Sequence, residues 1–262
     1  MFLGIDIGSS SSKVVILAPD QTILAAEAVN LGTGTKGAEQ VLAQAYDRAG
    51  VQAEDIRRIV ATGYGRMTFS AADQQITEIT CHAKAARFLA PELRTLLDIG
   101  GQDTKAIRLS PTGLVDNFVM NDKCAAGTGR FLEVMSRVLG CSLAQLSSLA
   151  LAGQEPVSIS SLCTVFAESE VISHLAAGKS LENVAAGAIR SVAQRVCGMA
   201  ERVGIQPAVG ISGGGALHPA LVAALSQALG CEVHPLPQPQ TAGALGAALF
   251  AWEQGTQKEA AH

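Results

Sequence analysis

The chain has 262 residues, a formal net charge of −4 and 27 glycines. Hydrophobic residues make up 48% of it and aromatic residues 4%, so small aliphatic side chains must build the core of one large or two modest α/β lobes. The negative balance argues against nucleic acid or an anionic membrane as the main partner. The sequence contains no apolar run of about 18 residues and no basic leader, which predicts a cytoplasmic protein without a membrane span. Six cysteines in that setting are more often free, catalytic or cluster-binding than disulfide-paired.

The first half of the chain alternates strand and helix patterns. Residues 3–29 contain alternating apolar runs that turn at Pro19-Asp20, which predicts a hairpin or meander. A helical apolar face follows over 37–49, then a strand over 56–62, the turn T-G-Y-G-R and a second helix over 78–89.

The segment that begins at residue 96 repeats the first segment. When Asp6 is set over Asp98, Lys13 falls on Lys105, and both copies turn at a proline. This match predicts that a strand, a D-I-G turn and two further strands occur twice.

The rest of the chain is predicted to be mostly helical, with helices near 130–139, 165–177 and 182–203. A short strand, A-V-G-I-S, then enters a glycine turn that opens a helix, and a last helix closes the chain. The predicted architecture is two similar α/β lobes with a cleft between them.

Three glycine-rich turns are candidates for contact with phosphate groups. The first runs from Asp6 through Gly8 and four serines to Lys13. Small residues let backbone N–H groups approach phosphate oxygens, although an ordinary Gly-Ser hairpin would look the same. The second contains Asp98, Gly100, Gly101, Gln102 and Asp103, and its acidic residues favour Mg²⁺ held through water. The third, Gly213–Gly215, follows a strand and would place a nucleotide at a helix N-terminus, although a purely structural turn is the default for a lone triplet.

Two cysteines stand out from the other four. Cys124 precedes A-A-G-T-G-R-F, and Cys163 precedes T-V-F, so both are expected near helix N-termini, where the helix dipole stabilises a thiolate. One chain offers only two such thiolates, so a four-thiolate cluster would need two chains related by a two-fold axis. The alternative is a pair of buried structural cysteines, which is also how we interpret Cys81, Cys141, Cys197 and Cys231.

These motifs, together with E-I-T-C-H-A-K at 78–84, resemble those of the activator ATPases of 2-hydroxyacyl-CoA dehydratases, whose family includes ATP-binding subunits of benzoyl-CoA reductase. The resemblance covers residues 2 to about 250. It implies a duplicated actin/hexokinase/Hsp70-like, ribonuclease H-like α/β fold with ATP between two lobes. The first lobe would span 1–92, with the C-terminal helix 240–254 packed back on it, and the second would span 93–239.

The resemblance also implies an oxygen-sensitive homodimer that shares one [4Fe–4S] cluster, with Cys124 and Cys163 of each chain as ligands. Such proteins take an electron from reduced ferredoxin or flavodoxin. They then use ATP to pass it at lower potential to a partner iron–sulfur enzyme.

Roles are carried over to individual residues by motif. Asp6 and Asp103 are expected to organise Mg²⁺ and water, and Asp6, Lys13 and Asp103 form the expected catalytic set. The expected nucleotide contacts are Gly8, Ser10, Ser11, Ser12, Lys13, Gly100, Gly101, Gln102, Gly127, Gly129, Gly213, Gly214, Gly215 and Gln240.

Two other functions fit the same fold. A small-molecule kinase would use an aspartate such as Asp103 as its general base. A nucleotide-regulated chaperone or filament protein would have no redox role. Both alternatives predict a protein without iron, so iron and sulfide analysis of anaerobically purified protein discriminates between them and the activator.

Overall fold

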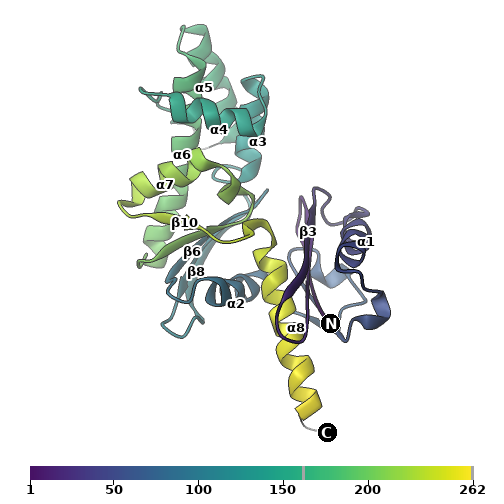
Figure 1. The fold of residues 1–262 in the computed structure, drawn as a ribbon. Coiled ribbons are helices and arrows are strands. Elements are labelled where there is room, and N and C mark those ends of the chain that lie inside the picture. Colours follow the sequence, from purple (N-terminus) through teal and green to yellow (C-terminus); the bar gives the residue numbers. More distant parts are fainter. Residues whose placement is uncertain (161–162, 261–262) are drawn as a thin grey trace. The chain divides into compact units, whose positions relative to one another are not determined.

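The computed structural model describes residues 1–160 and 163–260, without the side chains of residues 257–260, and the chain divides into two compact units (Figure 1). Unit 1 comprises Met1–Glu92, Leu109–Val115 and Leu236 to the end of the described chain. Unit 2 comprises Leu93–Arg108 and Asp116–Pro235. Each unit has its own sheet and its own hydrophobic core, as a separate α/β lobe requires.

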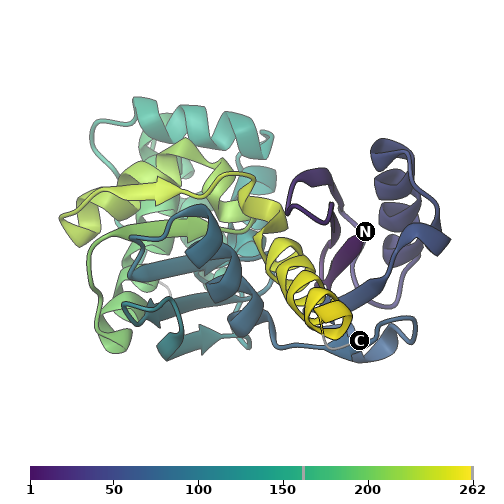
Figure 2. The ribbon, with the colours of Figure 1, turned by 60° about the horizontal axis from the view of Figure 1, so that its bottom comes forward.

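The sheet of unit 1 has the strand order β3-β2-β1-β4-β5. The central strand, β1, is antiparallel to β2 and parallel to β4. Every residue of β1 is buried, because helices cover both faces of the sheet. Helix α1 lies on one face and α8 on the other, where α8 also packs against α2 (Figure 2). The elements are β1 (Phe2–Ile7), β2 (Ser12–Leu17), β3 (Ile23–Val29), α1 (Gly37–Ala49), β4 (Arg58–Thr62), β5 (Gln74–Gln75), α2 (Glu78–Leu89) and α8 (Ala242–Ala260).

The sheet of unit 2 has the order β10-β9-β6-β7-β8. Strand β6 is antiparallel to β7 and parallel to β9, and the long helix α6 packs against α4 and α7. The elements are β6 (Thr95–Ile99), β7 (Thr104–Leu109), β8 (Val115–Asn121), α3 (Gly129–Val138), α4 (Leu143–Ala152), α5 (Thr164–Ala176), α6 (Leu181–Val203), β9 (Val209–Ser212), α7 (Pro219–Leu229) and β10 (Val233–Pro235).

The two sheets have the same topology, which confirms the repeat predicted from sequence. Strands β3, β2, β1 and β4 correspond in order to β8, β7, β6 and β9. In both sheets the strand that precedes the D-I-G turn lies between an antiparallel neighbour, β2 or β7, and a parallel neighbour, β4 or β9. The register places Asp6 opposite Lys13 in one sheet and Asp98 opposite Lys105 in the other. Each D-I-G turn therefore connects the central strand to its antiparallel neighbour.

The helices expected over 37–49 and 78–89 are confirmed at those bounds. Helix α4 was not predicted, although Ser142 and Gln145 form a capping box at its start, which is a recognisable sequence signal. The glycine triplet does not open α7 directly, contrary to expectation. It enters a 3-10 turn, Gly214–Leu217, and α7 begins at Pro219, because proline is well tolerated in the first helical turn.

No single helix among residues 1–160 and 163–260 is long and apolar enough to cross a membrane. Helices α3 and α4 pass such a test only as a pair bent by 81°, on length and composition alone. Phe131, Leu132, Met135 and Leu146 of these two helices are buried in the core of unit 2.

Glycines let α8 lie directly on its neighbours in unit 1. A Cβ at Gly246 would collide with the carbonyl oxygen of Cys81 in α2. We therefore expect Gly246→Ala to lower the free energy of unfolding by about 1–3 kcal/mol through overpacking, despite the higher helix propensity of alanine.

Gly198 in α6 is the matched control, because a Cβ there meets no atom within 4 Å. In urea denaturation Gly198→Ala should be neutral or stabilising by up to about 1 kcal/mol. Equal effects at the two positions would contradict this view of the packing of α8.

Candidate functional site

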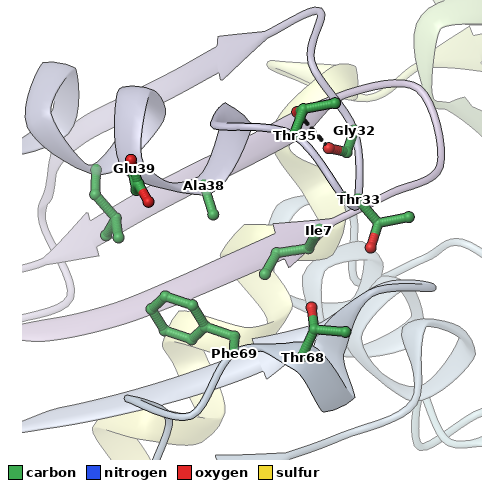
Figure 3. A pocket seen from close by; sticks show the side chains of 10 residues that line it. Ile7, Gly32, Thr33, Thr35, Ala38, Glu39, Thr68 and Phe69 are labelled. Atoms are coloured by element: carbon green, nitrogen blue, oxygen red, sulfur yellow. Dashed lines mark hydrogen bonds between the residues drawn. The ribbon is translucent and has the colours of Figure 1, made fainter.

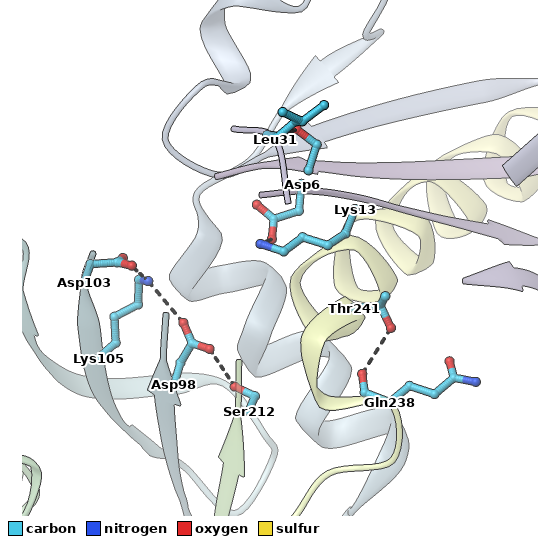
Figure 4. A network of polar contacts seen from close by, with 10 residues as sticks. Asp6, Lys13, Leu31, Asp98, Asp103, Lys105, Ser212, Gln238 and Thr241 are labelled. Atoms are coloured by element: carbon cyan, nitrogen blue, oxygen red, sulfur yellow. Dashed lines mark hydrogen bonds and ion pairs between the residues drawn. The ribbon is translucent and has the colours of Figure 1, made fainter. Parts of the chain in front are cut away.

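The first D-I-G turn is a tight, internally bonded loop in unit 1. The Gly8 N–H donates to the carbonyl oxygen of Ser11 at 2.9 Å, and the Ser12 hydroxyl donates to that of Leu31 at 2.7 Å. The Lys13 Nζ lies 3.2 Å from Asp6 Oδ2, and the Asp6 residue is only 6% exposed (Figure 4). The turn thus brings together a carboxylate, an ammonium group and a small-residue backbone, as the sequence predicted.

The Asp6 carboxylate is enclosed by glycines from other elements of unit 1. Gly63, just after β4, has a φ of +88°, and a Cβ there would collide with Asp6 Oδ1. A Cβ at Gly243 in α8 would lie 3.0 Å from both Asp6 Oδ2 and His82 Nε2. The buried imidazole of His82 therefore lies close to the Asp6 carboxylate, and the sequence analysis missed this residue although it stands in E-I-T-C-H-A-K.

The second D-I-G turn in unit 2 repeats this geometry and adds a carboxylate. The Gly100 N–H donates to the carbonyl oxygen of Asp103 at 2.9 Å. Lys105 forms ion pairs with Asp98, at 3.1 Å, and with Asp103 (Figure 4). The Ser212 hydroxyl of β9 donates to Asp98 Oδ1 at 2.9 Å. Asp98, Lys105 and Ser212 are therefore part of this site, and the predicted ligand set had left them out.

The third glycine turn is also duplicated. Gly213 has a φ of +79°, and a Cβ there would collide with the carbonyl oxygen of Ile99; a Cβ at Gly215 would lie 2.6 Å from the Cβ of Ile99. Gly63 and Gly65 stand in the same relation to Ile7 in unit 1. The segments T-G-Y-G and S-G-G-G are thus two copies of one turn that follows the parallel neighbour strand. Sequence reasoning treated them separately, although their equal spacing after β4 and β9 was a usable signal.

The segment around Cys124 is bonded to the second D-I-G turn, within unit 2. The buried Thr104 hydroxyl donates to the Gly127 carbonyl oxygen at 2.7 Å. The N–H groups of Gly129 and Arg130 donate to the carbonyl oxygens of Gly100 and Gly101, at 2.9 and 2.8 Å respectively. The predicted contact residues Gly127 and Gly129 therefore connect the second D-I-G turn to the Cys124 segment.

The side chain of Asn121 holds the other end of the same segment. Its Nδ2 donates to the carbonyl oxygens of Cys124, at 2.8 Å, and Ala126, at 3.0 Å, and its Oδ1 accepts from the Cys124 N–H at 3.3 Å. The Cys124 backbone is thus fixed by a residue that the sequence analysis did not single out.

Arg195 of α6 is a second residue near Cys124 that sequence reasoning missed. Its guanidinium lies 5.7 Å from the centroid of the Phe131 ring, and its side chain lies beside Gly127, where a Cβ would be 3.4 Å from Arg195 Cβ. Burial lowers the pKa of Arg195, and the charge of the Cys124 thiolate raises it in part. A cation therefore lies in the neighbourhood of this thiol.

Exposure separates the two predicted cluster cysteines from the buried ones. Cys124 and Cys163 are both exposed, whereas burial raises the pKa of Cys81 to about 12 and that of Cys197 to about 11. Cys163 directly precedes α5, as expected, with residues 161–162 outside the described chain. Cys124 lies further from its helix, four positions before Thr128, which precedes α3. Helices α3 and α5 pack against each other, so both exposed thiols belong to one helical part of unit 2.

The remaining predicted residue, Gln240, lies in a 3-10 turn, Pro239–Thr241, which belongs to unit 1 and leads into α8. A separate hollow of about 470 Å³ in unit 1 is lined by Ile7, Thr33, Thr35, Thr68 and Phe69, among others (Figure 3). The hydroxyls of Thr35 and Thr68 donate to the carbonyl oxygens of Gly32 and Gly65, at 2.6 and 2.7 Å. They help to hold the glycine turns that border this hollow.

Residues 3–251 match the model of the BadF/BadG/BcrA/BcrD ATPase family. The chain belongs to this family. It is 53% identical over 256 residues to the activator of lactoyl-CoA dehydratase of Anaerotignum propionicum, covering 98% of this chain and 99% of that one. The structure of the activator of the 2-hydroxyisocaproyl-CoA dehydratase from Clostridium difficile with bound ADPNP superposes with a TM-score of 0.97. It is 46% identical and covers 100% of this chain and 98% of that one.

A glucokinase of the ROK family from Streptomyces griseus is only 12% identical but has a TM-score of 0.58, covering 96% of this chain and 99% of that one. This likeness concerns the fold alone. It confirms the actin/hexokinase-like two-lobe α/β fold that the resemblance implied.

Proposed function

We propose that this ATPase is an ATP-dependent electron-transfer activator. Two copies would share one [4Fe–4S] cluster and deliver an electron at low potential to a partner iron–sulfur enzyme such as a 2-hydroxyacyl-CoA dehydratase. Reduced ferredoxin or flavodoxin would supply the electron. The observation that carries the proposal is the pair of exposed thiols in unit 2, one of which stands in a segment whose backbone is hydrogen-bonded to the second D-I-G turn.

The thiols fit such a cluster chemically. Thiolate sulfur is the usual ligand of iron–sulfur clusters, and four are needed. Among the described residues no group of three or more Cys, His, Asp or Glu side chains could hold a metal ion. Cys124 and Cys163 of a second copy would complete the ligand set, which supports a homodimer with two-fold symmetry.

The nucleotide would be MgATP, with its phosphates contacted by the two D-I-G turns. The small residues of both turns would let phosphate oxygens approach the backbone, Lys13 would add a positive charge, and Asp6 and Asp103 would hold Mg²⁺ through water. The glycine turn at Gly213–Gly215 and the turn containing Gln240 would lie near the nucleoside or its phosphates.

Within unit 2, the coupling between nucleotide and thiol would run through the chain's own hydrogen bonds. A shift of Gly100, Gly101 or Thr104 on phosphate binding or release moves the groups to which Gly127, Gly129 and Arg130 are bonded. Those residues continue directly into the Cys124 segment. When bound, a [4Fe–4S] cluster supplies one-electron chemistry. The protein would orient the cluster, leave it accessible to its electron-transfer partners and place the positive charge of Arg195 nearby.

Iron and acid-labile sulfide analysis of anaerobically purified protein, combined with its native mass, tests the proposal. We expect four irons and four sulfides per dimer. Iron-free protein that still hydrolyses ATP would contradict the redox role and favour the kinase or chaperone alternative.

Oxygen is expected to remove the cluster before it unfolds the protein. Both proposed ligand cysteines are exposed, so solvent and O₂ can reach the thiolates. Air should bleach the visible absorbance while far-UV circular dichroism stays nearly unchanged, with an aliquot kept under argon as the control. Absorbance that persists through prolonged aeration would mean that the cluster is buried, against the electron-delivery geometry proposed.

A further inference from the structure

The two D-I-G turns differ at one position that carries charge. The Gly8 N–H donates to the carbonyl oxygen of Ser11, and the Gly100 N–H donates to that of Asp103. Ser11 and Asp103 therefore occupy equivalent places in the two copies. A lysine follows two residues later in each copy. Lys13 pairs with Asp6, whereas Lys105 pairs with both Asp98 and Asp103.

We propose that Lys105 is a positioning residue that holds the Asp103 carboxylate for ATP hydrolysis. Its role would thus differ from that of Lys13, which the proposed function already places at the phosphates of the nucleotide. The inference deepens the proposed function and rests on its assignment of Asp103 to the hydrolytic site.

The surroundings of Lys105 support a positioning role. Its side chain is 2% exposed and is flanked by Asp98, which is also buried, and by Asp103, whose side chain is 23% exposed. An ammonium group is buried at acceptable cost only when it is paired, and charge-assisted hydrogen bonds are roughly twice as strong as neutral ones. Lys105 therefore has little freedom to leave its partners, and it fixes the more exposed carboxylate at the end of the turn.

The neighbours of this pair make room for the Asp103 side chain beside Lys105. A Cβ at Gly100 would collide with Asp103 Oδ1, so the glycine makes room for the carboxylate. The Ser212 hydroxyl donates to Asp98 Oδ1, which fixes the other partner of Lys105. A series of side-chain contacts thus runs from Ser212 to Asp98, from Asp98 to Lys105 and from Lys105 to Asp103. Through these contacts the buried groups orient the Asp103 carboxylate.

Lys13 has a different setting. Its side chain is 16% exposed, and the residue in the place of Asp103 is the uncharged Ser11. A Cβ at Gly8 would lie 3.3 Å from Lys13 Nζ, so the ammonium group lies beside the first glycine of the turn. An ammonium group at a small-residue turn with one carboxylate partner has more donors left for a phosphate oxygen than a buried one between two carboxylates.

Steady-state ATP hydrolysis by Lys105→Met and Lys13→Met separates the two roles. We expect Lys105→Met to lower kcat by about 100-fold, the cost typical of a misplaced reacting group, with KM for MgATP within about 3-fold of wild type. Lys13→Met should raise KM by about 10-fold or more through loss of a charge-assisted contact. Equilibrium binding of MgADP to cluster-free protein should show the same split, with weaker binding in the Lys13 variant only. A Lys105→Met variant that raises KM and leaves kcat unchanged would overturn the proposal.

The double variant Lys105→Met/Asp103→Asn tests whether Lys105 acts through Asp103. If it does, the double variant hydrolyses ATP within about 3-fold of Asp103→Asn alone, since residues in one network are not additive. Losses that multiply would overturn the positioning role. An Asp103→Asn variant with wild-type kcat would instead overturn the assignment of Asp103 itself, which is a failure of the proposed function.

Lys105→Met could fail to fold because the Asp98 carboxylate is left buried without its lysine. In that case Asp98→Asn/Lys105→Met removes both charges, and ATP hydrolysis is compared in this double variant with and without Asp103→Asn.

Discussion

Replacement of Cys124 or Cys163 by serine is expected to abolish the brown chromophore of the anaerobically purified protein. Each substitution removes two of the four ligands from a symmetric dimer, because both copies carry it. A serine hydroxyl is far harder to deprotonate than a thiol, so it does not replace the missing thiolates. Iron content per dimer and the visible spectrum measure the loss, and both should fall to the background of iron-free protein.

Cys197→Ser is the matched control, because Cys197 is buried in α6 and burial raises its pKa to about 11. At neutral pH very little of that thiol is thiolate, and the cluster should survive its removal. Thiol alkylation of cluster-free protein offers an independent measurement: Cys124 and Cys163 should react well before Cys81, whose pKa burial raises to about 12. A complete cluster in both single variants, or a full cluster in each monomer, would contradict a shared cluster.

Local sequence patterns were sufficient to predict the duplicated strands. The D-I-G turn, the lysine seven residues after its aspartate and the following proline recur at constant spacing, and strand register turns that spacing into an Asp–Lys pair across two strands. The helices over 37–49 and 78–89 were predictable for a similar reason, because their apolar faces have a helical period.

The residues that the sequence analysis missed are those that depend on contacts between distant segments. Ser212 meets Asp98 only because β9 pairs with β6, and His82 approaches Asp6 only because α8 packs closely through Gly243. Arg195 is an ordinary polar residue in sequence, and its place near Cys124 follows from tertiary packing. Asn121 is the exception, because it stands only three residues before Cys124 and its contacts there are local. Lys105 could be recognised from the repeat. The equivalence of Ser11 and Asp103 could not, because it follows from the hydrogen bond that each accepts from the first glycine of its turn.

Asp103→Ala is expected to reduce ATP hydrolysis by about 100-fold or more, since a group that positions water or organises the metal stabilises charge that develops in the transition state. The variant keeps the carbonyl oxygen of residue 103, which accepts the Gly100 N–H, so the turn itself should persist, and Lys105 keeps Asp98 as a partner. The loss should therefore appear in kcat while the melting temperature changes little.

The matched control for Asp103→Ala is Asp116→Ala, which removes an exposed carboxylate paired with Arg108 elsewhere in unit 2, at 2.7 Å. An exposed pair contributes on the order of 0–1 kcal/mol, so this variant should hydrolyse ATP at the wild-type rate. Glu259→Ala near the C-terminus serves the same purpose, although the side chain of Glu259 lies outside the described residues. Single-turnover measurements at saturating MgATP isolate the hydrolytic step from product release. If Asp103→Ala and Asp116→Ala hydrolyse ATP equally fast in that assay, Asp103 has no part in the reaction, and Asp98 becomes the acidic residue of the second turn to which the role would pass.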